Sequence, residues 1–503
     1  MYKKFLCWML AFAFVLVSGG DKLILSVGAG LIADGELDNP ETITMMQDFA
    51  DDKVMVVLTH EASLQFIDYT PADFPEFDFA EIQDLSAGKG AKVQAVLRGE
   101  QLEMDSIGAR FMNQNIDVVC FRRILSLKLA NPGKGNVMRA IVALEQRDDV
   151  YSAEPDYIYQ VDLGVETQST TSQNAPVFGW GAEKIEQEAA WEIETGSNTV
   201  YVGVVDSGID NTHPELDNKV RRGLSEDFVG DGLEATDDPL GHGTHVAGII
   251  GAKYDNDIIN FSGVCQYVRL VSLRVINQNN QVRSSALAGA INHAEANDIP
   301  LLNLSLVVNI HDNDRYNGVD ETDESLHTAI ANYNGLLICA AGNNAIDLKY
   351  INSETSQESI PAIWNFDNII SVGASNQTDA RWEDINNPSI IASNFDTAAV
   401  PGNRKVDIFA PGYNIVSCYP LSDCATSNCD SPGHANYGYH YFSGTSMATP
   451  FVTGVAALLF AHYPNATPTA IKNMILNSID EISALSGICL SGGRLNAYNA
   501  LSN

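Results

Sequence analysis

The most restrictive feature of this chain is a serine held between a tight glycine turn and an apolar run. Residues 436–459 read NYGYHYFSGTSMATPFVTGVAALL. Small residues allow a sharp turn before Ser446, and Pro450 suits the first turn of a helix, where backbone N–H groups have no intrahelical partner. The pattern predicts that Ser446 lies at a helix N-terminus, although an ordinary loop serine before a buried helix would read the same way.

A helix N-terminus suits a serine nucleophile, because backbone N–H groups and the positive end of the helix dipole stabilise an oxyanion. The serine also needs a base and a carboxylate that orients the base. Residues 200–208, VYVGVVDSG, predict a buried strand with Asp206 at its carboxyl end. Residues 239–251, PLGHGTHVAGIIG, place glycines around His242 before a helix. Asp206 and His242 are therefore candidate partners of the serine.

These segments resemble the signatures of the subtilisin-like serine proteases, the subtilase family. DSGID around Asp206, GHGTHVAG around His242 and GTSMATP around Ser446 follow the Asp, His, Ser order of subtilisin. The resemblance implies that Ser446 is the nucleophile, that His242 is general base and then acid, and that Asp206 orients the imidazole. It also implies an α/β, subtilisin-like three-layer fold with a mostly parallel central sheet and helices on both faces.

An oxyanion donor is implied by the same resemblance. Residues 336–344 read LLICAAGNN, a buried strand that opens into a glycine and two asparagines. Asn343 matches the family's oxyanion asparagine and would act together with the backbone N–H of Ser446. Asn344 fits better as a loop asparagine in the left-handed conformation.

The resemblance further implies a substrate-binding set. Its members are Ser305, Leu306, Val307, Gly342 and Ser359. Residues 301–308 match the strand that pairs with the substrate main chain, and a second pairing segment is expected near 277–282. Where the family usually has Ser-Leu-Gly, this chain has Val307, whose branched side chain would crowd the pocket for the residue before the scissile bond. Ser359 aligns with the base of that pocket.

The N-terminal residues have the pattern of an export signal. Residues 1–20 have lysines at 3 and 4, an apolar run from 5 to 17 and small residues at 18–20, as in a secretory signal peptide. A membrane anchor is the alternative, but the run is too short to span a bilayer comfortably. We therefore expect a secreted, extracellular protein without a stable membrane anchor.

The region between leader and signatures has its own pattern. Residues 21–165 resemble the inhibitor-like propeptide of subtilases, a small α+β domain that assists folding and blocks the cleft with its C-terminal tail. Residues around 66–110 look like an insertion in it, and a separate binding domain is the alternative interpretation. Residues 166–503 form the expected catalytic domain, and the polar stretch 166–174, ETQSTTSQN, is a reasonable place for self-cleavage.

Charge and cysteine content limit partners and environment. With 64 acidic and 29 basic residues, the formal charge of −35 argues against nucleic acid and anionic membranes as partners. The expected partners are protein or peptide substrates and the chain's own propeptide, with a monomer as the expected state. Export would permit disulfide bonds. The cysteines that remain after leader and propeptide are Cys265, Cys339, Cys418, Cys424, Cys429 and Cys489. Cys339 reads as a buried small hydrophobe, and the pairing of the others, or a zinc site among them, stays open.

A structural Ca²⁺ and no organic cofactor are also implied by the resemblance. Glu215 matches an acidic ligand position that follows the triad aspartate. After the helix of His242, Asp255, Asn256 and Asp257 form an oxygen-rich loop of the kind that binds Ca²⁺. A solvated turn is the alternative reading of that loop.

The chain is therefore expected to be a secreted serine endopeptidase that forms an acyl-enzyme on Ser446 and is made as a self-processing zymogen. Two alternatives remain. One is a processing protease of narrow specificity. The other is a catalytically silent binding protein that keeps the subtilase fold, which Val307 and the inserted loops would favour.

Overall fold

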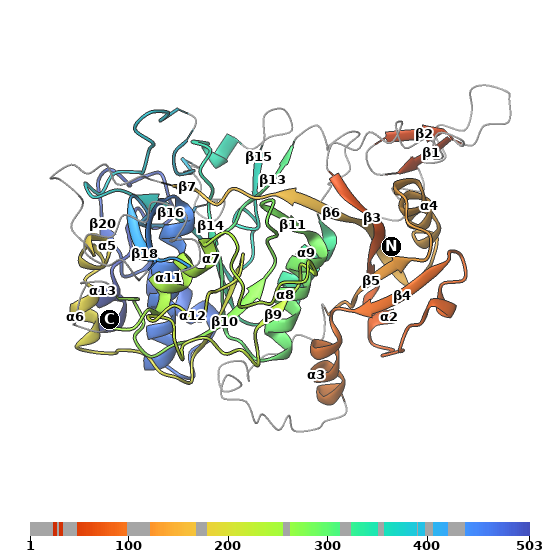
Figure 1. Ribbon diagram of the computed structural model, residues 1–503, viewed down its shortest axis with the longest axis horizontal. Helices are drawn as coiled ribbons and strands as arrows, with labels where there is room; N and C mark the ends of the chain where they lie inside the picture. Colours follow the sequence, from red (N-terminus) through yellow and green to blue (C-terminus); the bar gives the residue numbers. More distant parts are fainter. Residues whose placement is uncertain are drawn as a thin grey trace.

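The computed structural model describes residues 24–27, 30–33, 48–97, 121–166, 179–254, 262–311, 323–350, 357–389, 391–397, 406–420 and 438–503. The expected leader, residues 1–20, lies outside them. A smaller N-terminal domain and a larger domain, described from residue 179 onward, lie side by side (Figure 1).

The larger domain is built on a nine-stranded sheet in the order β20-β21-β17-β16-β14-β12-β8-β10-β9. Its strands are β8 (Tyr201–Asp206), β9 (Glu226–Asp227), β10 (Arg269–Arg274), β12 (Leu301–Leu304), β14 (Leu336–Ala340), β16 (Ile369–Ser375), β17 (Ile408–Pro411), β20 (Asp480–Glu481) and β21 (Gly493–Arg494). All neighbours are parallel except β20 with β21. The strand ends therefore share one carboxyl edge, where loops carry side chains to a common place.

Alternating side chains along each strand create the layers, because successive residues of a strand point to opposite faces. On β14, Leu336 and Ile338 join the core formed with α7 (His242–Gly251) and α11 (Thr445–His462). Leu337 and Cys339 join the opposite core, formed with α8 (Ser284–Ala296) and α9 (Glu324–Asn332). These two cores confirm the predicted three-layer α/β fold.

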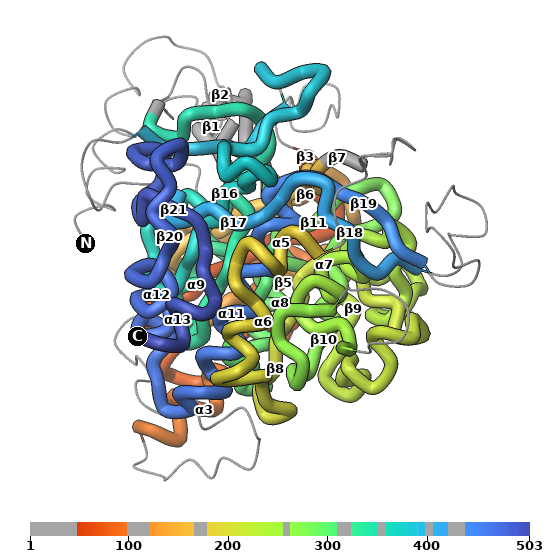
Figure 2. The backbone as a smooth tube through the Cα atoms, turned by 90° about the vertical axis from the view of Figure 1, so that its left-hand side faces the viewer, coloured from red at the N-terminus to blue at the C-terminus, as the bar shows by residue number. Residues whose placement is uncertain are grey.

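Helix α11 is the centre of the first core. Within the described ranges it is the one helix long and apolar enough to cross a membrane, and 89% of its window is buried inside the protein. It is therefore a core helix. The smaller helices around it are α5 (Trp180–Lys184), α6 (Gln187–Trp191), α12 (Pro468–Leu476) and α13 (Ala497–Ser502). Figure 2 shows α12 and α13 together near the C-terminus.

The N-terminal domain is a helix-covered antiparallel sheet in the order β11-β6-β3-β5-β4. Its elements are β3 (Asp48–Leu58), α2 (His60–Ser63), η1 (Pro71–Asp73), β4 (Phe79–Asp84), α3 (Ala87–Leu97), β5 (Ile124–Leu129), α4 (Lys134–Leu144) and β6 (Val150–Gln160), with a separate hairpin β1 (Ile24–Val27) and β2 (Gly30–Ala33). The stretch expected as an insertion supplies the edge strand β4 and helix α3. The fifth strand, β11 (Gln281–Arg283), comes from the larger domain.

Two carboxylates of β6 fasten the domains together. Glu154 and Asp156 stand two residues apart, so both point to the same face. Glu154 accepts a hydrogen bond from the Ser325 N–H at the start of α9, at 2.8 Å, and Asp156 accepts from the Ser285 N–H at the start of α8, at 2.9 Å. Burial raises the pKa of both carboxyls, and these N–H groups work against that rise. The N-terminal domain thus supplies acceptors that two helices of the larger domain lack.

Helix α7 lies so close to β18 (Ile415–Cys418) that Gly248 has no room for a side chain. A Cβ there would lie 2.2 Å from Ser417 Oγ and 2.9 Å from Cys418 Sγ. Gly248→Ala is therefore expected to lower the free energy of unfolding by about 1–3 kcal/mol, as overpacking does, measured by denaturant unfolding. Gly223→Ala is the control, because nothing lies within 4 Å of the new methyl group. Equal stability of the two variants would contradict the close packing of α7.

Candidate active site

The predicted carboxylate and imidazole meet at the carboxyl edge of the sheet. Asp206 is the last residue of β8, and His242 is the first residue of α7. Asp206 Oδ1 and His242 Nδ1 are 2.8 Å apart, and the two residues are 0% and 2% exposed. When the His242 imidazole donates a hydrogen bond to Asp206 from Nδ1, its other ring nitrogen, Nε2, faces away from Asp206.

The environment of this imidazole favours its protonated form. Burial disfavours the imidazolium, but the charge and hydrogen bond of Asp206, the charge of Asp238 and the backbone of Leu163 in the chain before the larger domain together more than offset that effect, so the pKa of His242 lies above its usual value. His245, one turn along the same helix, has a pKa well below its usual value, chiefly because of burial. Its Nε2 faces the carbonyl of Ile415 at 3.1 Å, so it is a structural histidine.

Ser446 is the second residue of α11, directly after the turn at Gly444 and Thr445. Its carbonyl accepts a hydrogen bond from Ser305 Oγ at 2.8 Å, which fixes the backbone of the first turn. Helices α7 and α11 pack against each other, and both begin at this edge of the sheet. Ser446 Oγ and His242 Nε2 are buried, and neither makes a hydrogen bond within the described residues. The backbone of Ser446 is therefore held in place, while its hydroxyl has no hydrogen-bond partner among the described residues.

Hydrogen bonds from neighbouring groups fix the orientation of the Asn343 side-chain amide. It follows β14, and its Oδ1 accepts hydrogen bonds from the Thr445 N–H at 2.8 Å and from Thr445 Oγ1 at 3.0 Å. A backbone N–H can only donate, so the oxygen must face Thr445 and Nδ2 must face away from it. Nδ2 lies 3.4 Å from a carboxylate oxygen of Asp162. Asn343 therefore presents a donor beside the first turn of α11.

A tail that leaves the N-terminal domain, residues 161–166, runs through this site. On one side, the Val161 N–H donates to the Asn280 carbonyl at 2.9 Å, and the Asp162 N–H lies 3.5 Å from the Val307 carbonyl. Val161 also pairs with Val308, the first residue of β13 (Val308–His311). Both segments expected to pair with a substrate main chain therefore contact the tail.

On the other side, the tail pairs with the strand that leads into α11. In β7 (Val165–Glu166), Val165 lies opposite Ser443 of β19 (Tyr439–Ser443). Gly164 approaches so closely that a Cβ would lie 2.8 Å from the Ser443 carbonyl oxygen, and its φ of +88° also favours glycine. Since Ser443 precedes Ser446 by one short turn, the tail passes close to the start of α11. Figure 1 shows its path from β6 to β7.

The remaining substrate-binding candidates are buried. Leu306 belongs to the core formed with α8 and α9, and Val307 is fully buried. Ser359, on β15 (Gln357–Ile360), accepts a hydrogen bond from Asn394 Nδ2 at 3.1 Å. A Cβ on Gly342 would lie 2.9 Å from Ser359 Oγ and 2.5 Å from Asn394 Nδ2. The structure thus brings Gly342 and Ser359 together and adds Asn394, which the sequence analysis missed because no motif surrounds it.

The predicted calcium ligands are only partly described. Glu215 Oε1 accepts a hydrogen bond from the Tyr439 hydroxyl at 3.3 Å. Asp255, Asn256 and Asp257 lie outside the described residues. In the part of the chain that the structure describes, no three His, Cys, Asp or Glu side chains form a group that could hold a metal. One of four expected ligands does not make a site, so calcium stays a prediction.

The described cysteines are thiols. Cys265, Cys339, Cys418 and Cys489 are buried, and no disulfide joins any two of them. Cys339 lies in the core under the sheet, as predicted. Cys424 and Cys429 lie outside the described residues, so their expected pairing is not tested.

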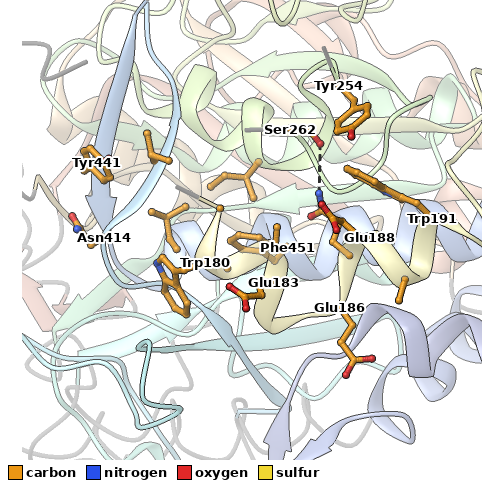
Figure 3. A pocket seen from close by; sticks show the side chains of 18 residues that line it. Trp180, Glu183, Glu186, Glu188, Trp191, Tyr254, Ser262, Asn414, Tyr441 and Phe451 are labelled. Carbon is orange, nitrogen blue, oxygen red and sulfur yellow. Dashed lines mark hydrogen bonds between the residues drawn. The ribbon is translucent and has the colours of Figure 1, made fainter. Parts of the chain in front are cut away.

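A cavity of about 580 Å³ lies beside α5 and α6 and not at the catalytic edge. Aromatic side chains of Trp180, Trp191, Tyr254 and Phe451 line it together with glutamates of the two helices (Figure 3). None of the predicted catalytic residues lines this cavity. The start of α11 with Ser446 lies instead near the tail, residues 161–166, which pairs with Ser443.

The raised pKa of His242 has a testable origin. Asp206→Asn removes the partner charge while burial remains, so the pKa of His242 is expected to fall below its usual value of about 6.5. In the unaltered protein the pKa of His242 is higher in the folded state than in the unfolded state, so protonation of His242 stabilises the folded protein. This stabilisation is fully present below about pH 6.5 and is lost as the pH rises through the folded-state pKa. NMR titration of the imidazole measures the change. Asp217→Asn, at an exposed carboxylate, is the control, and equal titration in both variants would contradict the assignment.

Comparison with known proteins shows the family of this chain. The model of the Subtilase family, Peptidase_S8, matches residues 197–496. A thermophilic serine proteinase of Bacillus sp. (strain AK1) is 32% identical over 367 residues, 73% of this chain and 76% of that protein. Thermitase of Thermoactinomyces vulgaris is 30% identical over 334 residues, 65% of this chain and 98% of thermitase. The crystal structure of MycP1 from Mycobacterium smegmatis superposes with a TM-score of 0.51 at 22% identity, covering 68% of this chain and 89% of MycP1. The chain therefore belongs to the subtilase family of subtilisin-like serine proteases.

Proposed function

We propose that this serine endopeptidase acts through a triad of Asp206, His242 and Ser446, and that it is made as a secreted, self-processing zymogen. The observation that carries the proposal is the buried Asp206–His242 pair, 2.8 Å apart, at the sheet edge where Ser446 begins α11. A carboxylate, an imidazole and an uncommitted hydroxyl are the three groups that acyl transfer to serine requires.

In the first step, Ser446 Oγ attacks the carbonyl carbon of the scissile peptide bond while His242 Nε2 takes the hydroxyl proton. Asp206 holds the Nδ1 proton and stabilises the imidazolium that forms. The tetrahedral intermediate collapses when the imidazolium gives its proton to the leaving amine. A water molecule, deprotonated by the same nitrogen, then hydrolyses the ester and restores Ser446.

The oxyanion of each intermediate receives two donors in this proposal. Asn343 Nδ2 is one, because Thr445 already holds the amide oxygen on the other side. The Ser446 N–H is the second, since the first N–H groups of a helix have no intrahelical acceptor. Donors fixed before the reaction need no reorganisation when the charge develops.

The zymogen proposal is supported by the tail of the N-terminal domain. Its main chain pairs with Asn280 on one side and with Ser443 on the other, as a bound peptide would. Asp162 places a carboxylate oxygen at Asn343 Nδ2, the donor assigned to the oxyanion. A side-chain carboxylate cannot be cleaved, so this segment would inhibit until it shifts. Removal of the N-terminal domain would then open the cleft.

Export and ion binding complete the proposal. Residues 1–20 would direct secretion, and the mature chain would act outside the cell as a monomer on protein or peptide substrates. A structural Ca²⁺ would be held by Glu215 with Asp255, Asn256 and Asp257. The bound ion would cross-link loops, with no role in peptide hydrolysis.

Replacement of the nucleophile tests the proposal. Ser446→Ala is expected to abolish casein hydrolysis, labelling by a fluorophosphonate probe and removal of the N-terminal domain, because no alkoxide can form. Gel mobility and probe fluorescence measure these outcomes in purified protein. Ser483→Ala, at an exposed serine, is a control that keeps the nucleophile. Casein hydrolysis by purified Ser446→Ala protein would defeat the triad, and absence of labelling in the unaltered mature protein would favour the silent binding protein.

A second candidate function is processing with narrow specificity. The close contacts beside Gly342 favour it, because a Cβ there would lie 2.5 Å from Asn394 Nδ2 and 2.9 Å from Ser359 Oγ. A branched residue at 307, where the family usually has glycine, would narrow the pocket further. Substrates with glycine, alanine or serine before the scissile bond would then be preferred.

The pocket wall can be opened by substitution. Val307→Gly is expected to raise kcat/KM for peptides with phenylalanine before the scissile bond by about tenfold or more, since small steric differences in a pocket change rates on that scale. A peptide series that varies only this residue measures the change. The matching alanine peptide is the control and should change little. An unaltered phenylalanine-to-alanine ratio would show that Val307 does not set the preference.

A further inference from the structure

A second carboxylate lies beneath the first turn of α7, outside the triad. Asp238 is 7% exposed, and donors surround both of its oxygens. Oδ1 accepts from Ser207 Oγ at 2.7 Å and from the Gly241 N–H at 3.0 Å. Oδ2 accepts from the Thr244 N–H at 2.8 Å and from Thr244 Oγ1 at 2.6 Å. Because every neighbour donates, the ionised form is the one that fits this place.

Ser207 joins Asp238 to the triad pair. Its hydroxyl donates to Asp238, and its Oγ accepts from the Gly243 N–H at 3.0 Å. The Ser207 N–H donates to Asp206 Oδ1 at 2.7 Å, and this oxygen also accepts from His242 Nδ1. A continuous set of buried hydrogen bonds therefore runs from Asp238 through Ser207 and Asp206 to the imidazole.

The same contacts supply what the start of α7 lacks. Its N-cap residue, Gly241, has no side chain to accept hydrogen bonds from the first turn. Ser207 Oγ instead accepts from Gly243, and Asp238 accepts from Thr244, so the second and third N–H groups of the helix are satisfied from outside. His242 is the first residue of this turn. Its position is therefore set by the cap that Asp238 and Ser207 build.

The charge of Asp238 acts on the imidazole as well. A helix N-terminus disfavours a positive charge such as an imidazolium at its first residue. The titratable groups that act on His242 are Asp206 at the end of β8, Asp238 in the preceding loop and His245 one turn along α7. The two carboxylates oppose the helix dipole, and His245 stays neutral.

We propose that Asp238 is a positioning residue for peptide hydrolysis: through Ser207 it fixes the first turn of α7, and its charge stabilises the imidazolium form of His242 during the reaction. This inference rests on the proposed triad. Asp238 touches neither substrate nor the reacting atoms, so its contribution falls on kcat and not on KM.

The test uses mature enzyme from the full-length chain, with active sites counted by a fluorophosphonate probe. Asp238→Asn should lower kcat/KM about tenfold or more, as expected when a catalytic base is slightly displaced, with KM near its original value. The acid limb of the kcat/KM profile should move to lower pH by about 0.5–1 unit, because the imidazolium loses a nearby negative charge. Asp237→Asn removes a charge from the same loop at an exposed position and should change neither quantity.

Ser207→Ala is the second variant, and it decides the question if Asp238→Asn does not fold. This variant breaks the hydrogen-bond connection between Asp238 and Asp206 but keeps both carboxylates. We therefore expect kcat per active site to fall several-fold, while the acid limb of the kcat/KM profile stays in place. A lowered melting temperature with unaltered kcat and pH profile in either variant would overturn the proposal. Activity loss in Asp238→Asn without a shifted acid limb would also overturn it. Failure of the triad itself would be distinct, since unaltered enzyme would then not react with the probe.

Discussion

Buried helix N-termini impose the constraint on which this active site depends. Each helix begins with N–H groups that have no intrahelical acceptor, and a buried helix start must find acceptors elsewhere. Four helices of the larger domain receive hydrogen-bond acceptors at their N-termini from residues outside the helix itself. These acceptors are Ser207 and Asp238 for α7, Asp156 for α8, Glu154 for α9 and Asn343 for α11. The contacts that satisfy the helices also position His242, Ser446 and the tail.

Asn343 shows how one group serves both stability and chemistry. Its oxygen holds the first turn of α11, and this bond leaves its nitrogen directed into the cleft. An aspartate of the same shape would repel the charge that the donor is proposed to stabilise. Two carboxylates act on His242 in different ways. Asp206 contacts the imidazole ring, and Asp238 acts through the backbone that carries the ring.

Sequence reasoning succeeded where chemistry requires a particular backbone. β-Branched runs ending in Asp206, and the strand before Asn343, were read correctly because buried parallel strands are continuously apolar. The glycine turns before His242 and Ser446 marked the helix starts. Asn394 and Asp162 could not be predicted, since a pocket wall and a tail contact arise from residues distant in the sequence. Asp238 was missed for a related reason: it caps α7 from outside the usual N-cap position, and only the folded loop brings it there.

The N-terminal domain contributes acceptors to helices that are not its own, and this has a thermodynamic consequence. While the chain is continuous, Glu154 and Asp156 meet α9 and α8 at the effective concentration of a tethered group, on the order of millimolar. A cut within the tail would turn the same contacts into an association between two molecules, governed by how much free fragment surrounds the enzyme. Dilution alone would then shift the balance toward an open cleft, with water replacing the carboxylates at both helix ends.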